Sequence, residues 1–129
     1  MINIRKVDEA TILEITEDLL SPHQAEQLDK MLEEVGREAV GLVIINLSKV
    51  QIVNGALWGV IVARAAEFRR EKKDIKLVGL AARSKRTIKH MKGDDVVETY
   101  ETEDDAIQSY SGNVTQVERN VLFGFKNTQ

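Results

Sequence analysis

The segment Leu42–Leu47 constrains the fold most strongly, because apart from Asn46 it is an unbroken run of aliphatic residues. A strand with one face in water alternates apolar and polar residues, whereas a strand covered on both faces does not. The run therefore predicts a central strand of a sheet that has other layers packed on both of its faces.

Strand and helix patterns alternate along the rest of the chain. Short aliphatic stretches bounded by turn residues predict strands, and apolar residues at every third or fourth position predict helices. The predicted strands cover 2–7, 11–15, 42–47, 75–80 and 96–100, and the predicted helices cover 22–36, 56–72, 84–92 and 103–109. This order, ββαβαβαβα, predicts one α/β domain over residues 1–110, with helices packed on a sheet.

Capping residues define the ends of the predicted helices. Ser21 with Gln24 begins the first helix and Gly36 ends it, Asn54 begins the second, Ser84 begins the third, Gly93 ends the third, and Thr102 begins the fourth. The apolar stripe of the first helix leaves open whether Met31 or Leu32 faces the core.

Residues 111–129 form a C-terminal extension beyond this pattern. Val114, Val117 and Val121 recur at helical spacing, and Phe123 and Phe125 follow them. Disordered tails are usually poor in such residues, so we expect the extension to pack, as a short amphipathic helix. Two alternatives stay open: it covers an edge or groove of its own domain, or it crosses to a second copy and makes a homodimer.

The overall charge of −3 hides a segregation of charge along the chain. Residues 64–92 carry a net charge of +8, and residues 93–105 carry −7. These segments either form solvated faces of helices and loops or create an electrostatic field that steers a partner. The small total charge predicts a soluble protein and does not indicate a nucleic-acid binder. The longest uncharged apolar run, 55–63, is too short to span a membrane, so we expect a cytoplasmic protein.

Residues that carry catalytic chemistry are few. There is no cysteine, and the two histidines, His23 and His90, lie far apart, so we predict no disulfide, metal or cofactor. No phosphate-binding glycine loop and no hydrolase motif occurs. Adjacent carboxylates such as Asp104 and Asp105 point apart rather than into one acid/base site. We therefore predict that the protein is not an enzyme.

The most informative motif covers residues 45–60, which read INLSKVQIVNGALWGV. It resembles the signature of STAS domains, D-L-S-x-V-x-x-I-D-S-S-G-L-G-V-L, in a family that includes bacterial anti-sigma factor antagonists and the cytoplasmic ends of sulfate transporters. The strand, short helix, strand and acidic helix start over 76–107 follow the family's order as well. The resemblance implies a small α/β domain with a mixed sheet of four or five strands and about four helices.

Several positions depart from that signature. Asn46 and Asn54 stand where the family has aspartate, and Gly55 stands where it has the serine that a partner kinase phosphorylates. Ala56 replaces the next serine. The resemblance therefore implies that no phosphate switch operates at Gly55. Ser48 is the hydroxyl nearest to this position, and because the family uses it structurally, we do not expect it to be phosphorylated.

The start of the second helix is the predicted partner-binding site. Its first N–H groups are free and carry a partial positive charge, and Asn54, Gly55 and Ala56 leave them accessible. Trp58 either fills a core position or serves as an aromatic anchor for the partner. The resemblance also places Arg83, after the fourth strand, beside this helix start, where it would add a charged contact.

The sequence thus predicts an interaction domain similar to an anti-sigma factor antagonist. It would bind an anti-sigma factor or another STAS-binding regulator, with no cofactor, nucleic acid or membrane involved. Two alternatives stay open. One is a scaffold subunit of a larger STAS-containing regulatory assembly. The other is a sensor of a nucleotide or small ligand, with phosphate held by the basic segment 64–92.

Overall fold

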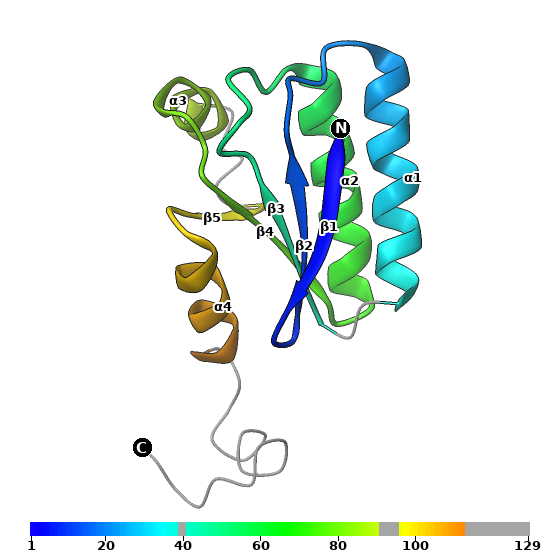
Figure 1. Cartoon of the computed structure of the whole chain (residues 1–129), viewed down its shortest axis with the longest axis vertical. Helices are drawn as coiled ribbons and strands as arrows, with labels where there is room; N and C mark the ends of the chain where they lie inside the picture. The colour runs from blue at the N-terminus through cyan, green and yellow to red at the C-terminus, as the bar shows by residue number, and fades with distance from the viewer. Residues whose placement is uncertain (39–40, 91–95, 113–129) are drawn as a thin grey trace, which may run out of the picture.

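The computed structural model describes residues 1–38, 41–90 and 96–112. Within these residues, the predicted order of strands and helices is confirmed (Figure 1). The elements are β1 (Ile2–Val7), β2 (Ala10–Ile15), α1 (Pro22–Glu38), β3 (Leu42–Asn46), α2 (Gly55–Arg70), β4 (Asp74–Val78), α3 (Ala82–His90), β5 (Glu98–Tyr100) and α4 (Glu103–Gly112).

The strands form one mixed sheet in the order β1-β2-β3-β4-β5. β1 runs antiparallel to β2, and a tight turn containing Asp8, with φ of 54°, joins the two strands. The other neighbouring pairs are parallel. Parallel neighbours need a crossover connection, and α1, α2 and α3 lie in these crossovers. The predicted mixed α/β sheet is therefore confirmed.

Helices cover both faces of the sheet (Figure 1). Val43 and Ile45 of β3 belong to the main core, which α1 and α2 cover. Leu42 and Ile44 point to the opposite face, where a second, smaller core includes Ile107 of α4. Because both faces of β3 are buried, its sequence is a continuous apolar run rather than an alternating one.

α1 is described to Glu38, two residues past Gly36, near which its end was predicted. Gly36 is a packing residue and not a stop signal, because a Cβ there would lie 2.8 Å from ring atoms of Phe68 on α2. Of the two candidates for the core side of α1, Leu32 is fully buried and Met31 is partly buried.

The prediction that Ser84 caps α3 is wrong. The helix begins at Ala82, and Ser84 is buried within it. A serine suits both a helix cap and a tightly packed helix face, so the sequence alone did not distinguish the two. The predicted cap of α4 is confirmed, since Thr102 Oγ1 accepts a hydrogen bond of 3.1 Å from the Asp105 N–H. The predicted end of α3 at Gly93 lies outside the described residues.

α4 extends to Gly112, slightly beyond the predicted domain boundary at residue 110. The rest of the C-terminal extension lies outside the described residues. The amphipathic helix expected from the valines of 114–121 therefore stays a prediction, as do both of its alternative packing sites.

Lys76 of β4 is fully buried, and its side chain points to the α4 face of the sheet. Its Nζ contacts the Glu98 carboxylate and lies 3.6 Å from Asp74 Oδ2 and 3.4 Å from the Tyr100 hydroxyl. Burial acts to lower the pKa of Lys76, but the hydrogen bond to Glu98 and the two carboxylates outweigh it and raise the pKa. The same Tyr100 hydroxyl hydrogen-bonds to Ser109, which links this polar cluster to α4.

Glu103, the first residue of α4, attaches that helix to two strands. Its carboxylate accepts hydrogen bonds of 2.6 and 3.0 Å from the Arg5 guanidinium on β1, and one of 2.7 Å from Asn46 Nδ2 at the end of β3. The Arg5 hydrogen bonds lower the pKa of Glu103 below its ordinary value of 4.5, although partial burial opposes them.

Glu103→Gln should therefore weaken the dependence of the unfolding free energy on pH below about pH 5. Because the folded-state pKa is depressed, the contribution of Glu103 is present above its ordinary pKa of 4.5 and is lost as the pH falls through the lowered value. Urea unfolding at a series of pH values measures this dependence. Asp104→Asn removes an exposed carboxylate from the same helical turn and is the matched control. An acid transition of unchanged steepness in Glu103→Gln would contradict the expectation.

Candidate functional site

The loops that follow β2, β3 and β4 lie at one end of the sheet, because the carboxyl ends of parallel strands share an edge (Figure 1). α1, α2 and α3 begin at this edge. The predicted partner-binding residues lie here as well. Asn54, Gly55, Ala56 and Trp58 are at the start of α2, and Arg83 is in the first turn of α3.

Asn54 caps α2 and also holds the neighbouring loop. Its Oδ1 accepts a hydrogen bond of 2.8 Å from the Leu57 N–H, as expected for an N-cap residue. Its Nδ2 donates a hydrogen bond of 3.1 Å to the carbonyl oxygen of Leu19, in the loop before α1. An ionised aspartate could accept the first bond but could not donate the second. The amide therefore gives this position a second attachment that a carboxylate would lack.

Asp18, in the loop before α1, forms a second link between the same two loops. Its Oδ1 accepts hydrogen bonds of 2.7 Å from the Gln51 N–H and 3.2 Å from the Ile52 N–H. Next to these contacts, Leu20 and Ile52 are 58% and 41% exposed. Sequence reasoning missed these residues, although an isoleucine in a predicted loop and a second leucine after Leu19 were available signals.

Gly55 and Ala56 are exposed, as predicted. A Cβ added at Gly55 would meet no atom within 4 Å, so the approach to the helix start is open. The first turn of α2 contains no acidic side chain to offset the partial positive charge there. We call Leu20, Ile52, Gly55 and Ala56 the α2-start surface. It combines free N–H groups at the start of α2 with exposed aliphatic side chains on the loops before α1 and α2, which suits a protein segment that carries both a carbonyl or carboxylate and apolar groups.

Trp58 and Arg83 occupy different environments. Trp58 is 9% exposed and belongs to the main core, which favours the core-filling interpretation over the interface anchor. Arg83 is exposed on α3, and no hydrogen bond or ion pair among the described residues joins it to the start of α2. Its part in partner binding stays a prediction.

Ser48 lies in a cavity apart from the α2-start surface. This cavity of about 390 Å³ is also lined by Glu101, Glu103 and Asp104. Glu103 and Glu101 are paired with Arg5 and Lys85, so a phosphate group on Ser48 would find Asp104 as a like charge and no unpaired cation among the described residues of the cavity lining, which disfavours it.

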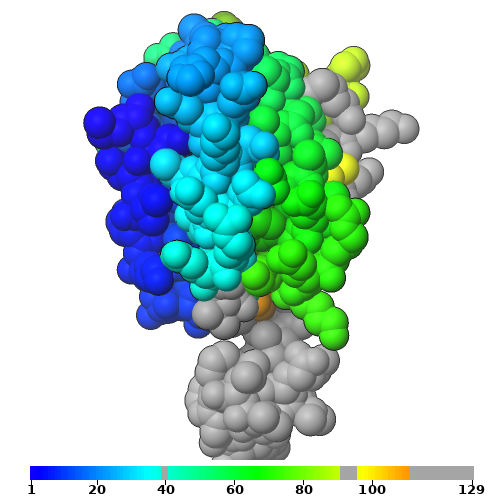
Figure 2. Space-filling view, turned by 90° about the vertical axis from the view of Figure 1, so that its right-hand side faces the viewer, coloured from blue at the N-terminus to red at the C-terminus, as the bar shows by residue number. Residues whose placement is uncertain are grey.

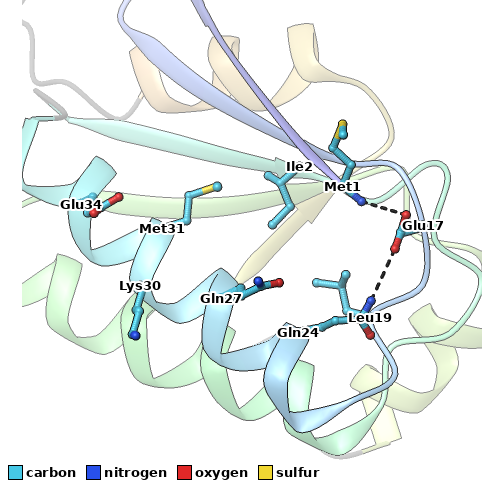
Figure 3. Close-up of a pocket in the computed structure, with 9 residues that line it drawn as sticks. All are labelled: Met1, Ile2, Glu17, Leu19, Gln24, Gln27, Lys30, Met31 and Glu34. Carbon is cyan, nitrogen blue, oxygen red and sulfur yellow. Dashed lines mark hydrogen bonds and ion pairs between the residues drawn. The ribbon is translucent and has the colours of Figure 1, made fainter.

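A groove of about 480 Å³ lies between β1 and α1, and Ile2 and Met31 face each other across it (Figure 3). Its lining combines apolar and charged side chains: Met1, Ile2, Glu17, Leu19, Gln24, Gln27, Lys30, Met31 and Glu34. None of the predicted site residues lines it. In the described part of the chain, no three His, Asp or Glu side chains are grouped as metal ligands. No helix in that part has the length and apolar character needed to cross a bilayer.

The domain is of the α/β class. It has a mixed sheet with helices on both faces, and the start of α2 is accessible. The model of the STAS domain matches residues 1–106, and the chain belongs to the STAS domain family. The resemblance inferred from the motif at 45–60 is thereby confirmed at the level of the family. No protein with a curated description matches the sequence.

Solved structures share this fold at low sequence identity. An anti-sigma factor antagonist from Mycobacterium paratuberculosis superposes with a TM-score of 0.76 at 17% identity, over 86% of this chain and 93% of that one. Bacillus SpoIIAA, an anti-sigma factor antagonist, gives a TM-score of 0.72 at 16% identity in its unphosphorylated form, over 89% and 100% of the two chains. A variant of RsbS from Moorella thermoacetica gives 0.72 at 18% identity, over 86% and 95%. At these identities the likeness establishes the fold.

Proposed function

We propose that this STAS domain is a non-catalytic interaction module that binds an anti-sigma factor, or a related regulatory protein, through the α2-start surface. The open approach to Gly55 carries the proposal, since a partner backbone or carboxylate can reach the first N–H groups of α2 without displacing any atom. Leu20 and Ile52 supply exposed apolar area on the two loops that Asp18 and Asn54 link. The likeness to solved anti-sigma factor antagonists supports the choice of partner class.

The proposed interaction runs without a phosphoserine switch. Asn54, Gly55 and Ala56 have no hydroxyl group that could accept a phosphate. The acidic surroundings of Ser48 argue against a switch at that position as well. Binding would then be controlled by the abundance or the state of the partner.

The structure gives less support to a sensor that holds phosphate on the basic segment 64–92. Arg64 of this segment is bound to Asp29 at 2.6 Å, and Lys85 is bound to Glu101 at 2.5 Å. Lys76 is buried against its carboxylate partners. These three cations are engaged in ion pairs within the domain, so they are poorly placed to hold a ligand. Arg83, Arg86 and Lys89 on α3 are exposed and make no ion pair among the described residues, so a phosphate site would have to use them.

Gly55→Glu should weaken binding of the partner at least about tenfold, because it places bulk and negative charge where the partner is expected to approach. Folding should survive, since a Cβ at this position meets no atom and a helix start tolerates negative charge. The measurement is calorimetric titration with a purified histidine-kinase-like anti-sigma factor, together with a circular-dichroism melt. Wild-type protein recovered after incubation with that anti-sigma factor and ATP should show no added phosphate by mass spectrometry.

Gly55→Gln is the matched control for this substitution, since it has the size of glutamate without the charge. If the Gly55→Glu variant binds the partner more weakly than the Gly55→Gln variant, the loss of affinity is due to charge. If both variants lose affinity equally, the loss is due to bulk. Full binding by both variants with intact melts would move the interface away from α2, and stoichiometric phosphate on the wild type would overturn the absence of a switch.

A further inference from the structure

β1 forms one edge of the sheet, and its outer side pairs with no strand among the described residues. The Thr16 N–H donates to the Met1 carbonyl oxygen at 3.0 Å, so Met1 and Thr16 face each other at a hydrogen-bonded position of the β1–β2 ladder. In an antiparallel ladder such pairs alternate with residues whose N–H and C=O point the other way. The backbone groups of Ile2, Ile4 and Lys6 therefore face outward, toward the open edge.

The side chains of the same residues point to the α1 side of the sheet. Ile4 pairs with Leu13 of the main core in the β1–β2 register, yet it is 50% exposed. Ile2 is partly buried and lines the groove beside α1 (Figure 3). In the space-filling view, β1 forms the margin of the face built by α1 and α2 (Figure 2). The edge thus combines outward backbone groups with an exposed isoleucine.

We propose that this edge pairs with β1 of a second copy of the chain, antiparallel and with a two-fold axis at Ile4. In this register Ile4 lies opposite Ile4 of the second copy, and Ile2 lies opposite Lys6. The outward N–H and C=O groups of each strand then pair with those of the other, and the two sheets become continuous. A two-fold contact of this kind is closed and self-complementary.

The charges of β1 suit this register. Lys6 lies opposite Ile2 of the second copy and Arg5 lies opposite Asn3, so like charges do not face each other across the strands. The exposed surface of Ile4 is buried against its own equivalent. These features select a second copy over an unrelated strand.

Light scattering of the full chain over a concentration series tests the proposal. Wild type should form a dimer. Ile4→Lys and Ile4→Glu should each raise the dissociation constant at least about tenfold, because like charges then lie directly opposite each other. An equimolar mixture of the two variants should restore the dimer as a heterodimer, which also demonstrates that both are folded. Restoration of the dimer is expected only for a register in which residue 4 of one copy faces residue 4 of the other copy.

Two controls make the outcome decisive. Ala66→Lys introduces the same charge at an exposed position of α2, away from β1, and should leave the dimer intact. The double variant Val117→Lys/Val121→Lys breaks the apolar pattern of the C-terminal extension and should also leave it intact. A monomeric wild type, a dimer that survives both substitutions at Ile4, or a dimer lost only in the Val117/Val121 variant would each overturn the proposal.

Discussion

Lys76→Ala should lower the free energy of unfolding by about 2–5 kcal/mol, as expected when a long side chain is removed from an enclosed site. Lys76 is fully buried, and its ammonium group compensates the carboxylates of Glu98 and Asp74. It also lies 5.1 Å from the centre of the Tyr100 ring. Truncation of Lys76 to alanine leaves a cavity between β4 and β5. It also removes the ammonium group around which the two carboxylates and the Tyr100 ring lie. Urea unfolding followed by circular dichroism measures the loss.

Lys76→Met is the matched control, because it keeps most of the side-chain volume and removes only the charge. Glu98 is 49% exposed, so its carboxylate can be solvated when the ammonium group is absent. We therefore expect the methionine variant to lose less than about 1.5 kcal/mol. A Lys76→Ala protein as stable as the wild type would show that the site is not enclosed.

Gly79→Ala should lower the unfolding free energy by about 2–4 kcal/mol, combining the cost of a positive φ with that of overpacking. Gly79 has φ of 75°, a conformation that residues with a Cβ rarely adopt. A Cβ there would lie 2.8 Å from Ser48 Cβ and 3.0 Å from Ser48 Cα and N. The Gly79 N–H also donates to the Tyr100 carbonyl oxygen at 3.1 Å, which fixes the backbone in place.

Gly59→Ala provides the contrast for this substitution. Gly59 is exposed within α2, and a Cβ there would meet no atom within 4 Å. Replacing a helical glycine by alanine should stabilise the domain by about 0.5–1 kcal/mol. The two substitutions make the same chemical change, so opposite shifts in the urea midpoint would assign the difference to backbone conformation and space. A Gly79→Ala midpoint at the wild-type value would contradict the tight contact with Ser48.

Local sequence patterns were sufficient for the elements of this domain and for part of its site. The apolar run of β3 indicated two covered faces, because burial on both sides removes the need for polar residues. Asn54 and Thr102 were identified as caps, because a cap depends on backbone groups only three residues away. The exposure of Gly55 followed from the same local reasoning.

Contacts between residues distant in sequence were decided by the tertiary structure alone. Gly36 would end a helix by its local pattern, yet it is a packing residue because Phe68 lies against it. The burial of Lys76 depends on Glu98 and on the strand order, neither of which periodicity reveals.

The sequence by itself therefore determined the order of the elements, the helix start that remains accessible and the absence of a hydroxyl at that start. The tertiary structure decided that Asp18 and Asn54 join two loops there and that Ile4 is left exposed at an open edge. The physical reason is the range of the interactions. Capping and periodicity act within a few residues, whereas ion pairs, close packing and strand pairing require that the chain has already folded.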